Sequence, residues 1–186
     1  ATWRRPAGVA DQVIGIGNSP IRLEMAKKMG MRAGFLHDDP DLLVKLDEAT
    51  SGVGIDLVVL TANPWPAYKT SLEIVRLNGR VSIVSLMGRG ESPLDFNPLD
   101  MEFFYAKGIS IIAVSGASGY LYPTPEDRFD GNRSSSFILS MMKEGKIEPK
   151  RLITHRFHYT EMEKAYEMAF DREKNMLGVI FNWKEG

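Results

Sequence analysis

The sequence contains no cysteine, and only three of its 186 residues are histidine. Without thiols the chain can form neither a disulfide nor a thiolate-based zinc site, and the lack of disulfides fits a cytoplasmic protein. Neither sign of charge prevails, because 23 basic residues stand against 24 acidic ones. The composition therefore points neither to nucleic acid nor to a membrane surface as a partner, and no apolar run approaches the roughly 20 residues that span a bilayer.

Short apolar runs alternate with amphipathic stretches along the first part of the chain. A capping side chain followed by proline predicts helix starts at Asn18–Pro20, Asp39–Pro40 and Asn63–Pro64. Asn78–Gly79 is expected to end the third helix, and Pro98–Lys107 is predicted to form another. The predicted strands are Gln12–Gly17, Ala33–Leu36, Ile55–Leu60, Arg80–Ser85 and Ile109–Val114. This order predicts an α/β fold with a Rossmann-like, doubly wound parallel sheet.

The last part of the chain follows a predicted long loop over Gly116–Asn132. In the first helix there, the apolar residues Phe137, Ile138, Met141 and Met142 are expected to be buried. The next helix carries Met162, Tyr166 and Ala169. The predicted elements are a helix over Ser134–Glu144, a strand over Leu152–Tyr159, a helix that begins at the capping box Thr160-x-x-Glu163, and a strand over Met176–Trp183.

The first strand ends in Gly15-x-Gly17, which invites interpretation as a pyrophosphate loop. That fingerprint needs a third glycine three residues later, where this chain has Pro20. The segment instead fits the end of the second strand of a Rossmann fold, where the adenosine ribose of a cofactor lies. No carboxylate is present there, and the candidate contacts are Gly17, Asn18, Ser19 and Arg22. This set favours NADP over NAD, although Asn18 and Ser19 are equally well explained as helix caps.

Two further strands end in polar or small residues. Because ligands of open α/β sheets lie beyond the carboxyl ends of the strands, these residues are candidate cofactor contacts. They are Thr61, Ala62 and Asn63 after one strand, and Ser85, Leu86 and Met87 after the other. Asn63 is also interpretable as a plain helix cap.

The histidines indicate neither a metal site nor a catalytic group. His37 stands beside Asp38 and Asp39, a run that we interpret as a solvated turn rather than a metal site. His155 and His158 are three residues apart on a predicted strand, so their side chains are expected on opposite faces. We therefore assign no catalytic residue and no metal ligand from the sequence.

Four segments, in order, resemble the nucleotide-binding half of the medium-chain dehydrogenase/reductase family, which includes the zinc-type alcohol dehydrogenases. They read VIGIGNSPIRLEMAKKMG, ATSGVGIDLVVLTA, SLEIVRLNGRVSIVSLMG and GKIEPKRLITHRFHYTEMEKAYEMA, and they cover nearly all of residues 10–182. The third segment, Ser71–Gly88, resembles the helix and strand of the family that end near the nicotinamide of the cofactor. The resemblance implies hydride transfer between NADP or NAD and an alcohol or carbonyl substrate. It also implies a partial NAD(P)-binding Rossmann domain over residues 1–150, and a return segment over 151–186 that in the family packs with the catalytic domain.

Set against the family pattern, the chain is expected to lack the first strand, glycine loop and helix of the Rossmann fold, as well as the catalytic domain. Zinc, if present at all, is expected only in that absent domain, and the isolated chain is expected not to turn over substrate. The resemblance also implies a homo-oligomer through the strand Ile109–Val114, an apolar edge. The alternatives are a non-catalytic nucleotide-binding or dimerisation module and, with less support, a methyltransferase-like Rossmann domain.

Overall fold

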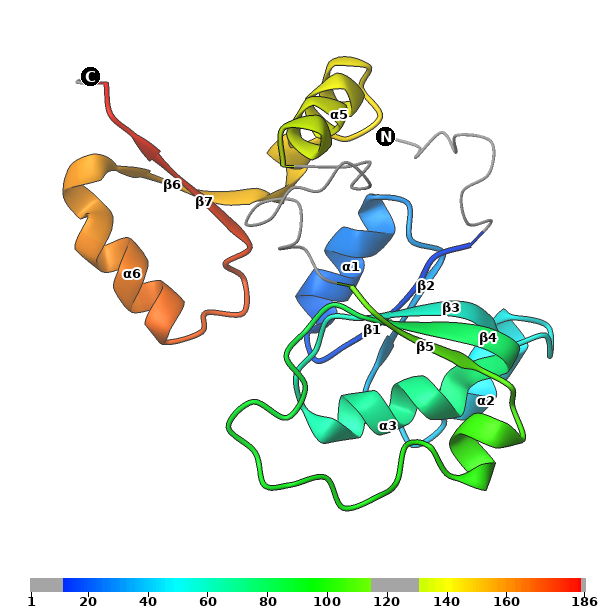
Figure 1. Cartoon of the computed structure of the whole chain (residues 1–186). Helices are drawn as coiled ribbons and strands as arrows, with labels where there is room; N and C mark the ends of the chain where they lie inside the picture. The colour runs from blue at the N-terminus through cyan, green and yellow to red at the C-terminus, as the bar shows by residue number, and fades with distance from the viewer. Residues whose placement is uncertain (1–11, 115–130, 185–186) are drawn as a thin grey trace. The chain divides into compact units, whose positions relative to one another are not determined.

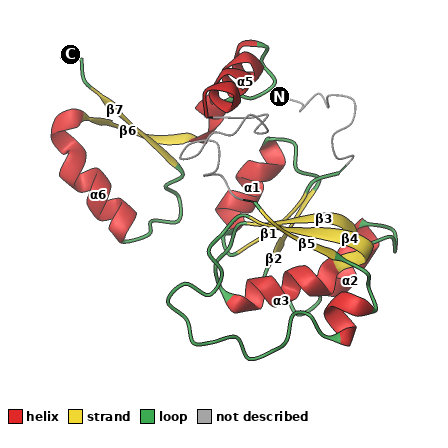
Figure 2. Cartoon of the chain, in the orientation of Figure 1, coloured by secondary structure: helices red, strands yellow, loops and turns green. Residues whose placement is uncertain are grey.

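The computed structural model of the chain describes residues 12–114 and 131–184 (Figure 1). Strands pair in parallel and are connected through helices, which confirms the predicted α/β class (Figure 2). The chain divides into two compact units, Ala1–Asp39 with Gly131–Gly186, and Pro40–Asp130. Of the described helices, none is long and apolar enough to cross a membrane.

The first unit begins with a strand–helix–strand segment that follows the prediction closely. Ser19 caps the helix, and Gly30 follows it with a φ of 106°, the left-handed conformation that favours glycine after a helix. The two strands pair in parallel, with Ile14 opposite Ala33. The elements are β1 (Ile14–Gly17), α1 (Pro20–Lys28) and β2 (Ala33–Leu36).

The C-terminal elements of the first unit form a two-stranded parallel sheet with flanking helices. The capping box differs from the prediction, because it joins His158 and Glu161 rather than Thr160 and Glu163. The long loop predicted from Gly116 falls outside the described residues up to 130, and the next helix begins at Gly131. The elements are α5 (Gly131–Lys143), η2 (Pro149–Leu152), β6 (Ile153–His158), η3 (Tyr159–Glu161), α6 (Met162–Phe170) and β7 (Gly178–Asn182).

Several residues predicted to be buried on α5 are exposed. Phe137 is 54% exposed, and the prediction is also wrong for Ile138 and Met142, whereas Met141 is half-buried. On α6, Tyr166 and Ala169 are exposed and Met162 is half-buried. Apolar spacing identifies the residues that share a helix face, but burial also requires a neighbouring element to cover that face.

The second unit contains a three-stranded parallel sheet in the order β3-β4-β5. Val81 of the central strand lies opposite Val58 on one side and Ile111 on the other. The elements are α2 (Leu42–Ala49), β3 (Ile55–Leu60), α3 (Trp65–Ile74), β4 (Val75–Ile83), the π-helix η1 (Met101–Tyr105) and β5 (Ser110–Ala113).

Element boundaries in the second unit correct four predictions. The N-cap of α2 is Asp41 rather than Asp39, and the N-cap of α3 is Pro64 rather than Asn63. The helix predicted to reach Asn78 ends at Ile74, and Asn78 instead adopts a positive φ of 58° where the β3–β4 register shifts. The helix predicted over residues 98–107 contracts to the π-helix, which Asp100 begins by accepting a hydrogen bond from Phe103 N at 3.0 Å.

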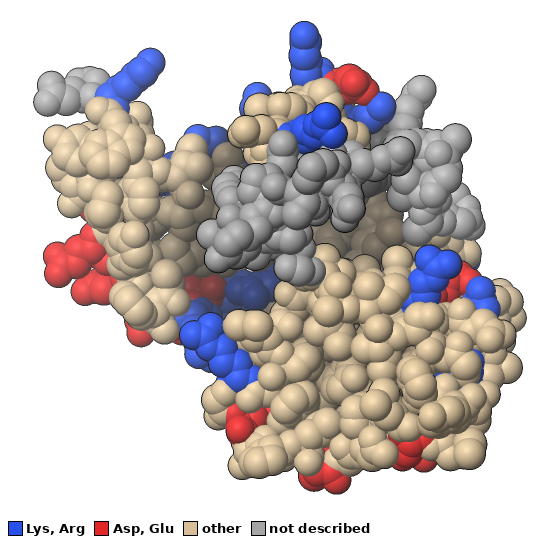
Figure 3. Space-filling model, viewed as in Figure 1, with Lys and Arg blue, Asp and Glu red and all other residues tan. Residues whose placement is uncertain are grey.

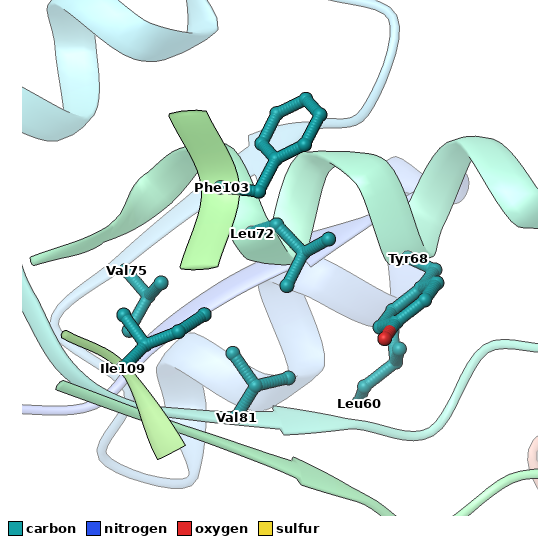
Figure 4. Packing of buried hydrophobic residues seen from close by; sticks show 7 residues of the cluster. All are labelled: Leu60, Tyr68, Leu72, Val75, Val81, Phe103 and Ile109. Atoms are coloured by element: carbon teal, nitrogen blue, oxygen red, sulfur yellow. The ribbon is translucent and has the colours of Figure 1, made fainter. Parts of the chain in front are cut away.

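The hydrophobic core of this unit lies between α3, the sheet and η1 (Figure 4). Leu72 and Val81 are fully buried. Tyr68 contributes an aromatic ring, and burial raises the pKa of its hydroxyl above the usual value. The buried cluster consists of Leu60, Tyr68, Leu72, Val75, Val81, Phe103 and Ile109. Lysines, arginines and acidic residues are spread over the face seen in Figure 3, and much of that face carries no charge.

Candidate cofactor-binding site

The first group of predicted contacts lies where β1 passes into α1. Ser19 is only 5% exposed, and its Oγ accepts a hydrogen bond from Arg22 N at 3.4 Å. Gly17 O accepts from His37 N at 3.0 Å, which ties the end of β1 to the residue after β2. Asn18 and the Arg22 side chain are exposed to solvent. Ser19 therefore acts as a helix cap, while Asn18 and Arg22 are accessible to a ligand.

The charge pattern of α1 suits an anion at its N-terminus. The first turn holds no acidic residue, whereas Lys27 and Lys28 lie in the last turn. The nearest carboxylate along the helix, Glu24, forms an ion pair with Lys27 at 2.8 Å, and this partner lowers the pKa of Glu24. Because the amide groups at a helix N-terminus carry partial positive charge, an unopposed first turn favours a phosphate group there.

The second group of predicted contacts comes together at the carboxyl ends of β3 and β4. Ser85 Oγ donates a hydrogen bond to Ala62 O at 2.9 Å and lies 3.2 Å from the Met87 sulfur. One residue earlier, Val84 N donates to Leu60 O at 3.0 Å and extends the strand ladder. Thr61, Ala62, Asn63 and Leu86 are exposed, and Ser85 is half-buried. The parallel pairing of the two strands thus places both predicted turns side by side.

A hollow that no sequence pattern indicates lies between the start of α3 and the segment 91–96. It has a volume of about 400 Å³ and is open to solvent. Trp65 forms part of its wall, and its indole N–H donates to Ser92 O at 2.8 Å. The lining residues are Trp65, Pro66, Lys69, Glu91, Ser92, Pro93, Asp95 and Phe96. A run such as Glu91-Ser92-Pro93 is typical of a turn, but no local signal joins it to Trp65, which lies 26 residues before Glu91.

Comparison with known proteins identifies the family. Residues 5–128, more than half of the chain, match the family described as zinc-binding dehydrogenase. The chain belongs to the zinc-binding dehydrogenase family. This assignment confirms the resemblance to the nucleotide-binding half of the zinc-type alcohol dehydrogenases.

Individual relatives are dehydrogenases named for different substrates. The chain is 27% identical to a sorbitol dehydrogenase of Halalkalibacterium halodurans over 154 residues, 83% of this chain and 40% of the relative. It is 30% identical to an L-threonine 3-dehydrogenase of Bacillus licheniformis over 162 residues, 87% of this chain and 42% of the relative. The chain thus spans less than half the length of the curated relatives that it matches.

The names of two other similar proteins include a cofactor. An NADP-dependent isopropanol dehydrogenase of Thermoanaerobacter brockii is 22% identical over 169 residues, 90% of this chain and 44% of the relative. A solved structure of an E. coli alcohol dehydrogenase in complex with NADH is similar with a TM-score of 0.69. It is 18% identical, covering 94% of this chain and 45% of that chain, so it shows the fold alone.

The described residues do not provide a site for the zinc that the family name implies. The sequence has no cysteine, and no group of three or more histidine, aspartate or glutamate side chains gathers in residues 12–114 or 131–184. The Nδ1 atoms of His155 and His158 lie at hydrogen-bond distance from Thr154 and Thr160, at 2.9 and 2.7 Å. Because structural and catalytic zinc sites use at least three protein ligands, these residues do not fit a zinc ion.

Proposed function

We propose that the chain is the nucleotide-binding part of an NAD(P)-dependent, alcohol dehydrogenase-like oxidoreductase. The reaction is hydride transfer between the cofactor and an alcohol or carbonyl substrate. The observation that carries the proposal is the pair of adjoining turns after β3 and β4, joined by the Ser85–Ala62 hydrogen bond, in a chain of the zinc-binding dehydrogenase family. Such strand ends are where open α/β sheets bind their ligands.

Within this proposal, Thr61, Ala62, Asn63, Ser85 and Leu86 contact the cofactor. When bound, the nicotinamide ring supplies or accepts the hydride. The hydroxyl of Ser85 already donates to Ala62 O, so Ser85 holds the two turns in place rather than donating to the ligand. Thr61 and Asn63 are exposed, and their polar side chains are free to orient a ligand by hydrogen bonds.

The domain boundaries follow the family resemblance and remain part of the proposal. Residues 1–150 form a partial NAD(P)-binding Rossmann domain, and residues 151–186 form the return segment that packs with the catalytic domain of the whole enzyme. In that enzyme the catalytic domain supplies the Lewis acid and the proton relay. We therefore expect the purified 186-residue chain not to reduce ketones, and steady-state turnover with NADPH would contradict this expectation. We also place the protein in the cytoplasm.

NADP is the proposed preference, and Arg22 is the residue that tests it. Truncation of the exposed guanidinium by Arg22→Ala should weaken NADPH binding about five- to tenfold, because one charge-assisted contact to the 2′-phosphate is lost. NADH lacks that phosphate, so its affinity should not change. Isothermal titration calorimetry of the chain with both nucleotides measures the difference.

Lys28→Ala, at the opposite end of α1, serves as the control for Arg22→Ala and should change neither affinity. An equal loss for NADPH and NADH in Arg22→Ala would refute the proposed 2′-phosphate contact. Tighter binding of NADH than of NADPH by the unmodified chain would refute the NADP preference itself.

The alternative function is a non-catalytic nucleotide-binding or dimerisation module, and one observation favours its second half. β5 is the last strand of its three-stranded sheet, and Ile112 and Val114 beside that edge are 42% and 47% exposed. An apolar edge of this kind recruits another strand. We propose a homodimer through Ile109–Val114, which light scattering should detect. Ile112→Lys should then yield monomers, and a monomeric mass for the unmodified chain would refute the dimer.

A further inference from the structure

The segment that follows β4 is held against the start of α3 by contacts that the strand ladder does not provide. Trp65 N donates to Glu91 Oε2 at 3.0 Å, and Trp65 Nε1 donates to Ser92 O at 2.8 Å. Gly88 N donates to Asn63 O at 2.8 Å. Both N–H groups of one residue therefore secure the distant segment, an arrangement that we call the Trp65 clasp.

Gly88 shows how closely the indole of Trp65 lies against this segment. A Cβ at Gly88 would lie 2.0 Å from one carbon of the Trp65 ring and 2.2 Å from another. Its φ of 64° is also in the left-handed region, which disfavours a side chain. The indole thus packs directly on the bare backbone of Gly88. Only glycine allows this approach.

The carboxylate of Glu91 stabilises the clasp through the helix as well as through the hydrogen bond. Trp65 is the first residue of α3, and Pro64 at the N-cap has no side chain that accepts a hydrogen bond. Glu91 from a distant part of the chain therefore satisfies an amide that the N-cap leaves open. A negative charge at this end of a helix is further favoured by the helix dipole.

We propose that Trp65 and Glu91 are positioning residues for the nicotinamide end of the cofactor. This inference rests on the proposed function, because Ser85 and Leu86 are the contacts that the clasp would position. Those two residues lie between the last ladder bond, Val84 N to Leu60 O, and the clasp that begins at Gly88. A loop fixed on both sides before the ligand arrives does not have to be ordered on binding, which raises affinity.

The test uses variants that remove one contact of the clasp each. Trp65→Phe removes the donor to Ser92 O but keeps a ring against Gly88, and Glu91→Ala removes the acceptor for Trp65 N. Glu91→Gln retains a side-chain oxygen that accepts and should restore binding. Ser92→Ala is the matched control, because the carbonyl of Ser92 belongs to the main chain and survives the substitution.

Each variant of the 186-residue chain is titrated by calorimetry with NADPH and, separately, with adenosine 2′,5′-bisphosphate, which lacks the nicotinamide end. Trp65→Phe and Glu91→Ala should each weaken NADPH binding about three- to tenfold, the range expected for one net hydrogen bond. Binding of the adenosine bisphosphate should stay as in the unmodified chain. A purely structural role would change thermal stability without separating the two ligands.

The outcomes distinguish this inference from the function on which it rests. If the unmodified chain binds neither ligand, the proposed function fails and the inference falls with it. If the unmodified chain binds both ligands and the two variants bind NADPH equally well, only the inference is overturned. Equal losses for both ligands, or a Ser92→Ala variant that loses as much as Trp65→Phe, would overturn it too.

Discussion

The two units differ sharply in how their apolar residues are covered. Among the buried hydrophobic residues of segments 12–114 and 131–184, only Phe157 and Ala165 belong to the first unit, whereas the second unit holds the whole cluster around Leu72 and Val81. Helices α5 and α6 of the first unit instead expose large side chains such as Leu139, at 62%, and Phe170, at 81%. The second unit thus has a core of its own, whereas α5 and α6 leave several large apolar side chains exposed.

This contrast explains which parts of the fold could be predicted from the sequence. Strands β2 and β3 have the predicted bounds, because apolar β-branched or aromatic runs end at turns that the same stretch of sequence specifies. The predicted capping box at Thr160 and the predicted burial of Phe137 were wrong, because each depends on which neighbouring segment competes for or covers a group. Local pattern cannot supply that information.

In the candidate site, too, some contacts could be predicted from the sequence and others could not. The meeting of Thr61–Asn63 with Ser85 followed from parallel strand order, and the Ser85–Ala62 hydrogen bond shows that the two turns adjoin. The burial of Ser19 and the contact of Trp65 with Glu91 did not follow. The first is a matter of packing, and the second joins residues far apart in the sequence whose local patterns indicate only a helix start and a turn.

The largest expected effect tests the core of the second unit. Leu72→Ala should lower the free energy of unfolding by about 3 kcal/mol, because it leaves a cavity in the fully buried cluster. Leu139→Ala on exposed α5 is the matched control and should change it by less than about 0.5 kcal/mol. Urea denaturation followed by circular dichroism measures both. Comparable losses in the two variants would show that α5 is covered and remove the contrast.

An intermediate effect is expected at the end of α3. Lys107 Nζ donates to the carbonyl oxygens of Leu72 and Glu73 at 2.7 Å each, and burial lowers the pKa of this ammonium against the opposing effect of Glu73 and Glu102. Lys107→Met keeps the apolar stem but leaves the carbonyls without this donor, so it should cost about 1–2 kcal/mol of unfolding free energy.

Exposed Lys150→Met is the control for Lys107→Met and should have no measurable effect in the same denaturation experiment. A Lys107→Met chain as stable as the unmodified one would mean that water or the main chain replaces the ammonium at the end of α3. The second unit would then owe its stability to apolar packing alone.

The smallest expected effect is that of Tyr68 on the pH dependence of the unfolding free energy. Burial raises the pKa of Tyr68, so above about pH 10 the folded chain holds the phenolic proton longer than the unfolded chain does. The stability contribution of Tyr68 is therefore complete below that pH and is lost as the pH rises through the folded-state pKa. Tyr68→Phe should unfold with a flatter dependence on pH between 9.5 and 11. An unchanged slope would contradict the burial of the hydroxyl.

The most direct test of the central claim is a titration of the ¹⁵N-labelled chain with NADPH, followed by amide chemical shifts. If the chain is the nucleotide-binding part of a zinc-binding dehydrogenase, saturable shifts should appear at Gly17–Arg22 and at the turns Thr61–Asn63 and Ser85–Leu86. Amides of the buried strand around Val81 should move little. Saturable shifts confined to other segments, or no shifts at millimolar NADPH, would contradict the account.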